Sequence, residues 1–137
     1  LINLDAEIVV NKRYKEGMLS SVQEGLKSLP EGTEAVMVLL GDQPMISSQI
    51  INRITDGYKH SEKEIIVASY KGKRGHPILV GSRYFSEILN FSKDQSLRHL
   101  LDLHPEDIEE IDTENPEILR DIDTEQDYRN ELKQHEI

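Results

Sequence analysis

The sequence predicts an α/β fold in which a mostly parallel sheet includes one antiparallel strand. Short apolar segments typical of strands alternate with segments whose apolar residues recur every three or four positions, as in amphipathic helices. The six apolar residues from Ala35 to Leu40 suit a strand that is covered on both faces. They are followed by Gly41-Asp42-Gln43-Pro44, so a carboxylate lies beyond the carboxyl end of a buried strand, where open α/β sheets bind ligands.

The first half of the chain contains two strand patterns, each followed by a helix pattern. Between Gly17 and Pro30, leucine and valine residues recur at helical spacing. A set of isoleucines repeats this spacing behind Ser47 or Ser48, either of which can cap a helix. The expected elements are a short strand at 7–10, a helix at 18–29, a strand at 35–40 and a helix at 47–57.

The second half begins with an interruption of this alternation. Strand patterns at Ile65–Tyr70 and His76–Val80 flank a basic loop, Lys71–Gly75, so the later strand is expected to run antiparallel to a neighbour. Thr124 with Asp127 indicates a capping box at the start of a last helix. Helices at 84–90 and 96–103 and an edge strand at 109–111 complete the expected elements. The whole chain, 1–137, is expected to form a single domain.

Composition narrows the class of protein. The chain has no cysteine, which excludes disulfides and cysteine metal sites and fits a cytoplasmic protein, so any metal must be held by oxygen or imidazole. We expect no membrane partner, because no run of about 18 apolar residues occurs. Residues 102–137 contain 14 acidic and 3 basic residues, a charge of -11, whereas the rest contains 12 and 13, a charge of +1. This distribution argues against a nucleic-acid partner.

Two acidic motifs are candidates for a metal site. Mg²⁺ prefers hard oxygen ligands and often uses only one or two carboxylates from the protein. Asp42 is the first candidate, and Asp121 and Asp123 are the second, because strand alternation would point both of them the same way with Ile122 toward the core. The alternative is that these residues belong to an ordinary turn and to the cap of the last helix.

Two further segments are candidates for binding phosphates or a base. Gly17, Met18, Ser20 and Ser21 stand at a helix N-terminus, where free N–H groups and hydroxyls can bind an anion, although both serines can equally act as capping residues. The second segment is the basic loop together with the first residues of the next strand. A flexible cationic loop of this kind can reach over a phosphorylated ligand. The candidates there are Lys73, Arg74, Gly75, His76 and Pro77.

Four motifs in this order resemble those of the MobA-like nucleotidyltransferases, with the molybdenum cofactor cytidylyltransferases as the closest branch. The motifs occupy residues 11–26 (NKRYKEGMLSSVQEGL), 40–44 (LGDQP), 72–80 (GKRGHPILV) and 121–128 (DIDTEQDY). The resemblance implies a Rossmann-like three-layer nucleotidyltransferase fold. It also implies transfer of a nucleoside monophosphate, CMP from CTP or GMP from GTP, to a phosphorylated acceptor with Mg²⁺ and release of pyrophosphate. In the cytidylyltransferase branch the acceptor is molybdopterin.

The resemblance also assigns roles to residues. Asp42 and Asp123 become the catalytic metal ligands, with Asp121 in reserve. The nucleotide would contact Gly17, Met18, Ser20, Ser21 and Gly41, and the acceptor would contact Lys73, Arg74, Gly75, His76 and Pro77. A molybdoenzyme that receives the product is the implied protein partner.

The chain departs from the family pattern at its start. Members open with a strand and a glycine-rich loop carrying Arg and Lys, which grips the triphosphate, and these residues contain no such loop. We therefore expect that strand and loop to lie upstream of Leu1, and residues 1–137 alone to be inactive. A non-catalytic module that delivers cofactor to a molybdoenzyme, docking through the acidic tail, remains an alternative. A transferase with another acceptor, such as GTP-dependent transfer to molybdopterin or transfer to an isoprenoid precursor, is also open.

Overall fold

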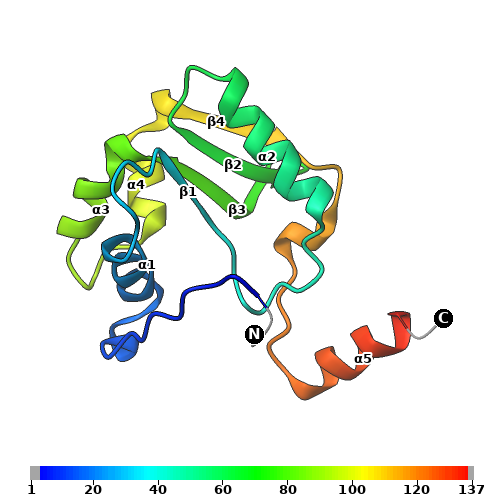
Figure 1. Cartoon of the computed structure of the whole chain (residues 1–137). Coiled ribbons are helices and arrows are strands. Elements are labelled where there is room, and N and C mark those ends of the chain that lie inside the picture. Colours follow the sequence, from blue (N-terminus) through cyan, green and yellow to red (C-terminus); the bar gives the residue numbers. More distant parts are fainter. Residues whose placement is uncertain (1–3, 136–137) are drawn as a thin grey trace. The chain divides into compact units, whose positions relative to one another are not determined.

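A computed structural model of the chain describes residues 4–135, in which helices and strands follow one another in an α/β order (Figure 1). The described residues form two compact units, 4–36 with 80–106 and 37–79 with 107–135. The helices are α1 (Met18–Lys27), α2 (Ser48–His60), α3 (Phe85–Asn90), α4 (Leu97–Leu103) and α5 (Glu125–His135). The strands are β1 (Ala35–Val38), β2 (Ile65–Tyr70), β3 (Lys73–Gly81) and β4 (Ile108–Asp112).

The four strands form one sheet in the order β1-β3-β2-β4. Strand β2 pairs in parallel with β4, with Ile65 opposite Ile108 and Ser69 opposite Asp112. A two-residue turn joins β2 to the antiparallel β3, and both turn residues, Lys71 (φ 49°) and Gly72 (φ 77°), have the positive φ that a tight hairpin needs. The predicted α/β class, with parallel pairing and an antiparallel strand, is confirmed.

Three local predictions are wrong. Residues 7–10 form no strand, because in the described part of the chain they pair with no other strand, and Ile8 and Val10 are 72% and 73% exposed. Lys73, Arg74 and Gly75 belong to β3 rather than to a flexible loop, since the tight hairpin extends strand pairing up to the turn. Residues 121–123 are not in a strand, so strand alternation does not orient Asp121 and Asp123.

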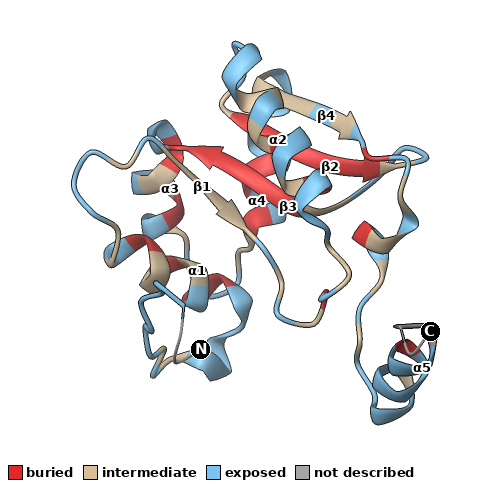
Figure 2. Cartoon of the chain, turned by 45° about the vertical axis from the view of Figure 1, so that its right-hand side comes forward, coloured by how far each residue is buried: buried red, intermediate tan, exposed pale blue. Residues whose placement is uncertain are grey.

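The second unit is built around β2. Its residues Ile65 to Ala68 are completely buried (Figure 2), and each isoleucine buried in this way contributes about 1.5–3 kcal/mol. Helix α2 packs on β2 and β4. A Cβ at Gly57 would lie 2.0 Å from Cδ1 of Ile111 and 3.6 Å from Cγ2 of Ile66, so a larger residue there would require the end of the Ile111 side chain to shift.

The chain that follows β4 is tied back to the sheet of the second unit. The Thr113 N–H donates to the Ser69 carbonyl (2.9 Å), and the Arg53 guanidinium of α2 donates to the carbonyls of Asp112 (2.6 Å) and Thr113 (3.1 Å). A short 3₁₀ turn at Pro116–Leu119 then buries Ile118 completely. The burial of Ile118 therefore holds the start of the segment 120–123 in place.

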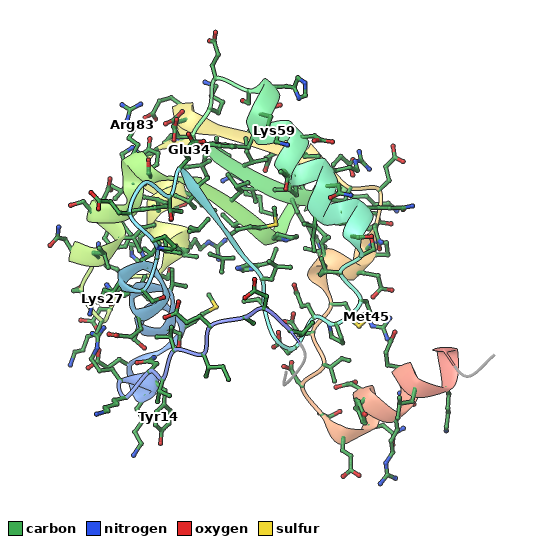
Figure 3. All side chains as sticks on the ribbon, in the orientation of Figure 1. Tyr14, Lys27, Glu34, Met45, Lys59 and Arg83 are labelled. Carbon is green, nitrogen blue, oxygen red and sulfur yellow. The ribbon has the colours of Figure 1, made fainter. Side chains whose placement is uncertain are left out.

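The first unit contains α1, α3 and α4. The buried side chain of Gln23 on α1 donates to the carbonyls of Ile88 (2.9 Å) and Phe91 (3.1 Å), at the end of α3. The Ser82 N–H donates to the carbonyl of Glu34 (2.7 Å). Glu34 and Arg83, the residue that follows Ser82, are labelled in Figure 3. Leucines and isoleucine from the three helices form the core, namely Leu19, Leu26, Ile88, Leu97, Leu100 and Leu101.

Helix α5 begins with the predicted capping box. The Asp127 carboxylate accepts from the Thr124 N–H (2.9 Å) and hydroxyl (2.6 Å), and the Thr124 hydroxyl accepts from the Asp127 N–H (3.1 Å). These bonds lower the pKa of Asp127 below its ordinary value. Within the described residues, no helix combines the length and apolar character required to cross a membrane.

Candidate functional site

The loop between β1 and α2 carries Asp42 and Gln43. The Gln43 N–H donates to the Leu40 carbonyl (3.2 Å), and the Gln43 carbonyl accepts from the Ile46 N–H (3.3 Å), so the loop is a tight double turn. The Ser47 hydroxyl then accepts from the Ile50 N–H and caps α2. Met45, labelled in Figure 3, lies in this loop. The result is a half-buried Asp42 beside a Gln43 side chain that is only 6% exposed.

The segment that follows Ile118 lies directly against this loop. The Ile122 N–H donates to the backbone carbonyl of Asp42 (2.9 Å). The Gln43 side-chain amide donates to Oδ1 of Asp121 (2.6 Å) and more weakly to the Ile118 carbonyl (3.4 Å). The structure thus places the two acidic motifs, which are far apart in the sequence, side by side in the second unit.

Asp121 and Asp123 differ in their surroundings. Both are exposed, but only Asp121 accepts a hydrogen bond from the Asp42 loop. Asp123 stands immediately before the capping box of α5. The sequence pattern predicted that the two carboxylates occupy equivalent positions of one strand. In the structure their positions are not equivalent.

His76 on β3 belongs to the same unit and is half-buried. Burial lowers the pKa of His76 below its ordinary value, while the negative charges of Asp121 and Asp42 act in the opposite direction. Both carboxylates are thus within electrostatic reach of one imidazole. Because burial dominates, the neutral form of the imidazole is favoured.

Three buried polar atoms around this loop have no hydrogen-bond partner. They are Oδ1 of Asp42, Oε1 of Gln43 and Nε2 of His76. A buried polar atom without a partner costs about 1–3 kcal/mol, and native proteins contain few such atoms. Three of them on neighbouring side chains make this loop a candidate site for a polar ligand.

The donor set fits a hard divalent cation. Oδ1 of Asp42 and a carboxylate of residues 121–123 are oxygen ligands of the kind that Mg²⁺ and Mn²⁺ prefer. Within residues 4–135, no group of three or more histidine and acidic side chains forms a ready-made metal cage. A cation here would therefore take its remaining ligands from water and phosphate, as Mg²⁺ commonly does.

The residues assigned to the acceptor lie along β3. Arg74 is exposed and pairs with Glu110 of β4, so part of its charge is neutralised. Gly75 lies against the Ile118 carbonyl, and Pro77, joined to His76 by a cis peptide bond, is completely buried. Lys73 is exposed near the hairpin turn. Lys73 and His76 are therefore the side chains of this set best placed to meet a ligand.

The residues assigned to the nucleotide, apart from Gly41, lie in the first unit. Gly17 (φ 105°) begins α1 in a conformation that favours glycine. The Ser20 hydroxyl is buried, accepts from the Asn11 side chain (2.8 Å) and donates to the Gly17 carbonyl (2.7 Å). Ser21 is exposed and also accepts from Asn11 (2.9 Å), while Met18 is 46% exposed. Ser20 thus has a structural contact, and Ser21 with the backbone of Gly17 and Met18 is more accessible.

Sequence reasoning missed two side chains that organise these segments. Gln43 was part of a motif but carries no charge and no titratable group that would indicate a chemical role. Asn11 was notable only as one residue of a motif, although its side-chain amide donates hydrogen bonds to both Ser20 and Ser21. The only sequence signal for either residue was its place in a motif.

The chain belongs to the family of MobA-like NTP transferase domains, whose family model matches residues 1–109. The resemblance inferred from the four motifs is therefore confirmed. The matched range includes Asp42 and residues 73–77, whereas Asp121 and Asp123 follow it.

One characterised relative is the molybdenum cofactor cytidylyltransferase of Escherichia coli (strain K12). It is 28% identical to this chain over 121 residues, which cover 88% of the chain and 59% of the relative. The chain thus spans 59% of the length of this curated relative.

Solved structures show the same fold. Rv0371c from Mycobacterium tuberculosis H37Rv is 26% identical with a TM-score of 0.71, covering 84% of this chain and 59% of that one. A complex of Rv0371c with manganese is 25% identical with a TM-score of 0.67, at coverages of 82% and 59%. The 4-diphosphocytidyl-2C-methyl-D-erythritol synthase from Anaerococcus prevotii DSM 20548, with a TM-score of 0.68 and coverages of 86% and 64%, is only 14% identical and shares the fold alone.

Proposed function

We propose that this protein transfers CMP from CTP to a phosphorylated acceptor of the molybdopterin type and releases pyrophosphate, with a divalent cation bound at Asp42. Membership of the MobA-like NTP transferase family and the cytidylyltransferase relative support the reaction class. The observation that carries the site is the unpartnered, buried Oδ1 of Asp42 next to the segment of Asp121 and Asp123. GTP in place of CTP, or a different phosphorylated acceptor, would use the same groups.

Two motifs supply the carboxylates. Asp42 contributes from the β1–α2 loop, and Asp123 or Asp121 contributes from the segment that is bonded to this loop. When bound, Mg²⁺ would neutralise charge on the triphosphate and orient its oxygens. The protein side chains would hold the ion and fix its position.

The remaining candidates would bind the two substrates. A neutral His76 can donate one ring N–H to a phosphate oxygen or a pterin group, and Lys73 offers a positive charge on the same strand. A Cβ built at Gly41 would meet nothing within 4 Å, so the backbone there is open to a nucleotide. Ser21 and the backbone of Gly17 and Met18 are the other nucleotide candidates.

Binding of Mn²⁺ to the 137-residue chain tests the site. We expect Asp42→Asn to weaken Mn²⁺ binding at least tenfold, measured from the electron paramagnetic resonance signal of free Mn²⁺, with an unchanged thermal midpoint. Asp56→Asn, on the exposed face of α2, is the matched control. Equal Mn²⁺ affinities of Asp42→Asn and the unmodified chain would reject the cation site.

The transfer reaction has its own test. Pyrophosphate release from CTP and from GTP, with molybdopterin as acceptor, is measured on the longest form of the protein that its gene encodes. We expect release with CTP to exceed release with GTP and to disappear in Asp42→Asn. Mn²⁺ binding without any nucleoside triphosphate turnover in that form would favour the non-catalytic docking module.

A further inference from the structure

Gln43 makes more hydrogen bonds at the candidate site than any of the acidic residues predicted there. Its side chain is 6% exposed. The amide nitrogen donates to Oδ1 of Asp121 (2.6 Å) and, at 3.4 Å, to the Ile118 carbonyl. The amide oxygen, Oε1, is buried and has no partner. Gln43 thus contacts the carboxylate segment with one end of its amide and leaves the other end available.

The orientation of this amide follows from its surroundings. Both neighbours of the nitrogen, the Asp121 carboxylate and the Ile118 carbonyl, are acceptors. A flipped amide would place Oε1 against these two oxygens, and the repulsion excludes that arrangement. Nε2 must therefore face Asp121, and Oε1 must face away from it.

We propose that Gln43 is a positioning residue, which holds Asp121 rather than Asp123 as the second carboxylate of the cation site. This inference rests on the cation site of the proposed function. The amide engages Oδ1 of Asp121 and leaves Oδ2 available to a ligand. The carboxylate is then oriented before a cation binds.

Two hydrogen bonds hold Asp121 and its neighbour to the Asp42 loop. The first runs from the Gln43 side chain to the Asp121 carboxylate, and the second from the Ile122 N–H to the Asp42 carbonyl. Among the described residues, the Asp123 carboxylate has no such bond to the loop. Asp123 is instead the residue before the capping box, and its backbone N–H faces the Asp127 carboxylate.

The electrostatics around His76 agree with this assignment. The charges that oppose the effect of burial on the pKa of His76 come from Asp121 and Asp42. Both carboxylates therefore lie within electrostatic reach of the same imidazole.

Four variants of the 137-residue chain test the inference through Mn²⁺ affinity. They are Gln43→Met, Asp121→Asn, Asp123→Asn and the double variant of Gln43→Met with Asp121→Asn. Methionine keeps the volume of glutamine and removes the amide. We expect Gln43→Met and Asp121→Asn each to weaken Mn²⁺ binding about tenfold. The double variant should bind no more weakly than Asp121→Asn, because Gln43 acts through Asp121. The loss in Asp121→Asn should exceed the loss in Asp123→Asn at least fivefold.

The outcomes separate this inference from the proposed function. If the double variant lost Mn²⁺ affinity by the product of the two single losses, Gln43 would act independently of Asp121. That result would overturn the positioning role. A larger loss in Asp123→Asn than in Asp121→Asn would overturn the choice of carboxylate, while the cation site at Asp42 would stand. If Gln43→Met fails to fold, the comparison of the two aspartate variants, both at exposed positions, still decides which carboxylate is used.

Discussion

Gly75→Ala should damage both the stability of the chain and the candidate site. A Cβ at this position would lie 2.4 Å from the Ile118 carbonyl oxygen, about 0.9 Å closer than the roughly 3.3 Å at which carbon and carbonyl oxygen ordinarily meet. The obstacle is backbone, so no rotamer change relieves it. Ile118 is 0% exposed, and the segment cannot move outward without exposing that side chain.

The cost combines two effects. Overpacking of this kind costs about 1–3 kcal/mol, and complete loss of the Ile118 burial would add about 1.5–3 kcal/mol. Partial relief of both gives an expected loss of about 2–4 kcal/mol in the free energy of unfolding. With a slope near 2 kcal/mol per molar urea, the unfolding midpoint should fall by about 1–2 M. Circular dichroism at 222 nm follows the transition.

The same variant should also weaken Mn²⁺ binding, because the displaced Ile118 carbonyl and Asp121 are both partners of Gln43. Gly41→Ala is the matched control, since a Cβ there meets nothing within 4 Å, and its stability should change by less than about 0.5 kcal/mol. A Gly75→Ala chain whose urea midpoint equals that of the unmodified chain would refute the packing argument.

Three further predictions follow from the same geometry. Gly57→Ala should lower the free energy of unfolding by about 1–2 kcal/mol, because its Cβ would meet Cδ1 of Ile111 at 2.0 Å. Adding Ile111→Val to the same chain removes that atom and should restore most of the lost stability in urea titrations. Because burial lowers the pKa of His76, the unfolded chain binds the proton more readily, so stability should fall as the pH drops from about 6.5 through the lower folded pKa. Urea midpoints at pH 5, 6 and 7 should show a weaker pH dependence in His76→Gln, and an identical dependence would contradict this. Gly41→Ala should weaken CTP binding in calorimetry with Mn²⁺ present, and unchanged affinity would remove Gly41 from the nucleotide site.

The sequence by itself determined the class and most elements of the fold. The apolar run at Ile65–Ala68 became the buried strand β2, and the helical spacing of isoleucines became the buried face of α2. The capping box of Thr124 and Asp127 was readable because its partners are three residues apart. Family membership could also be inferred from the sequence, because short motifs in a fixed order indicate it.

Only the tertiary structure decided how the site is organised. The bond between Gln43 and Asp121 and the contact between Gly75 and Ile118 join residues that no local pattern relates. Lys73 became part of a strand because its backbone pairs beside a tight hairpin, although its side chain suggested a mobile loop. Periodicity records which face of an element is buried, whereas long-range hydrogen bonds depend on how the chain closes on itself. Residue type alone therefore indicated carboxylates at the site, and their arrangement around Gln43 depended on folding.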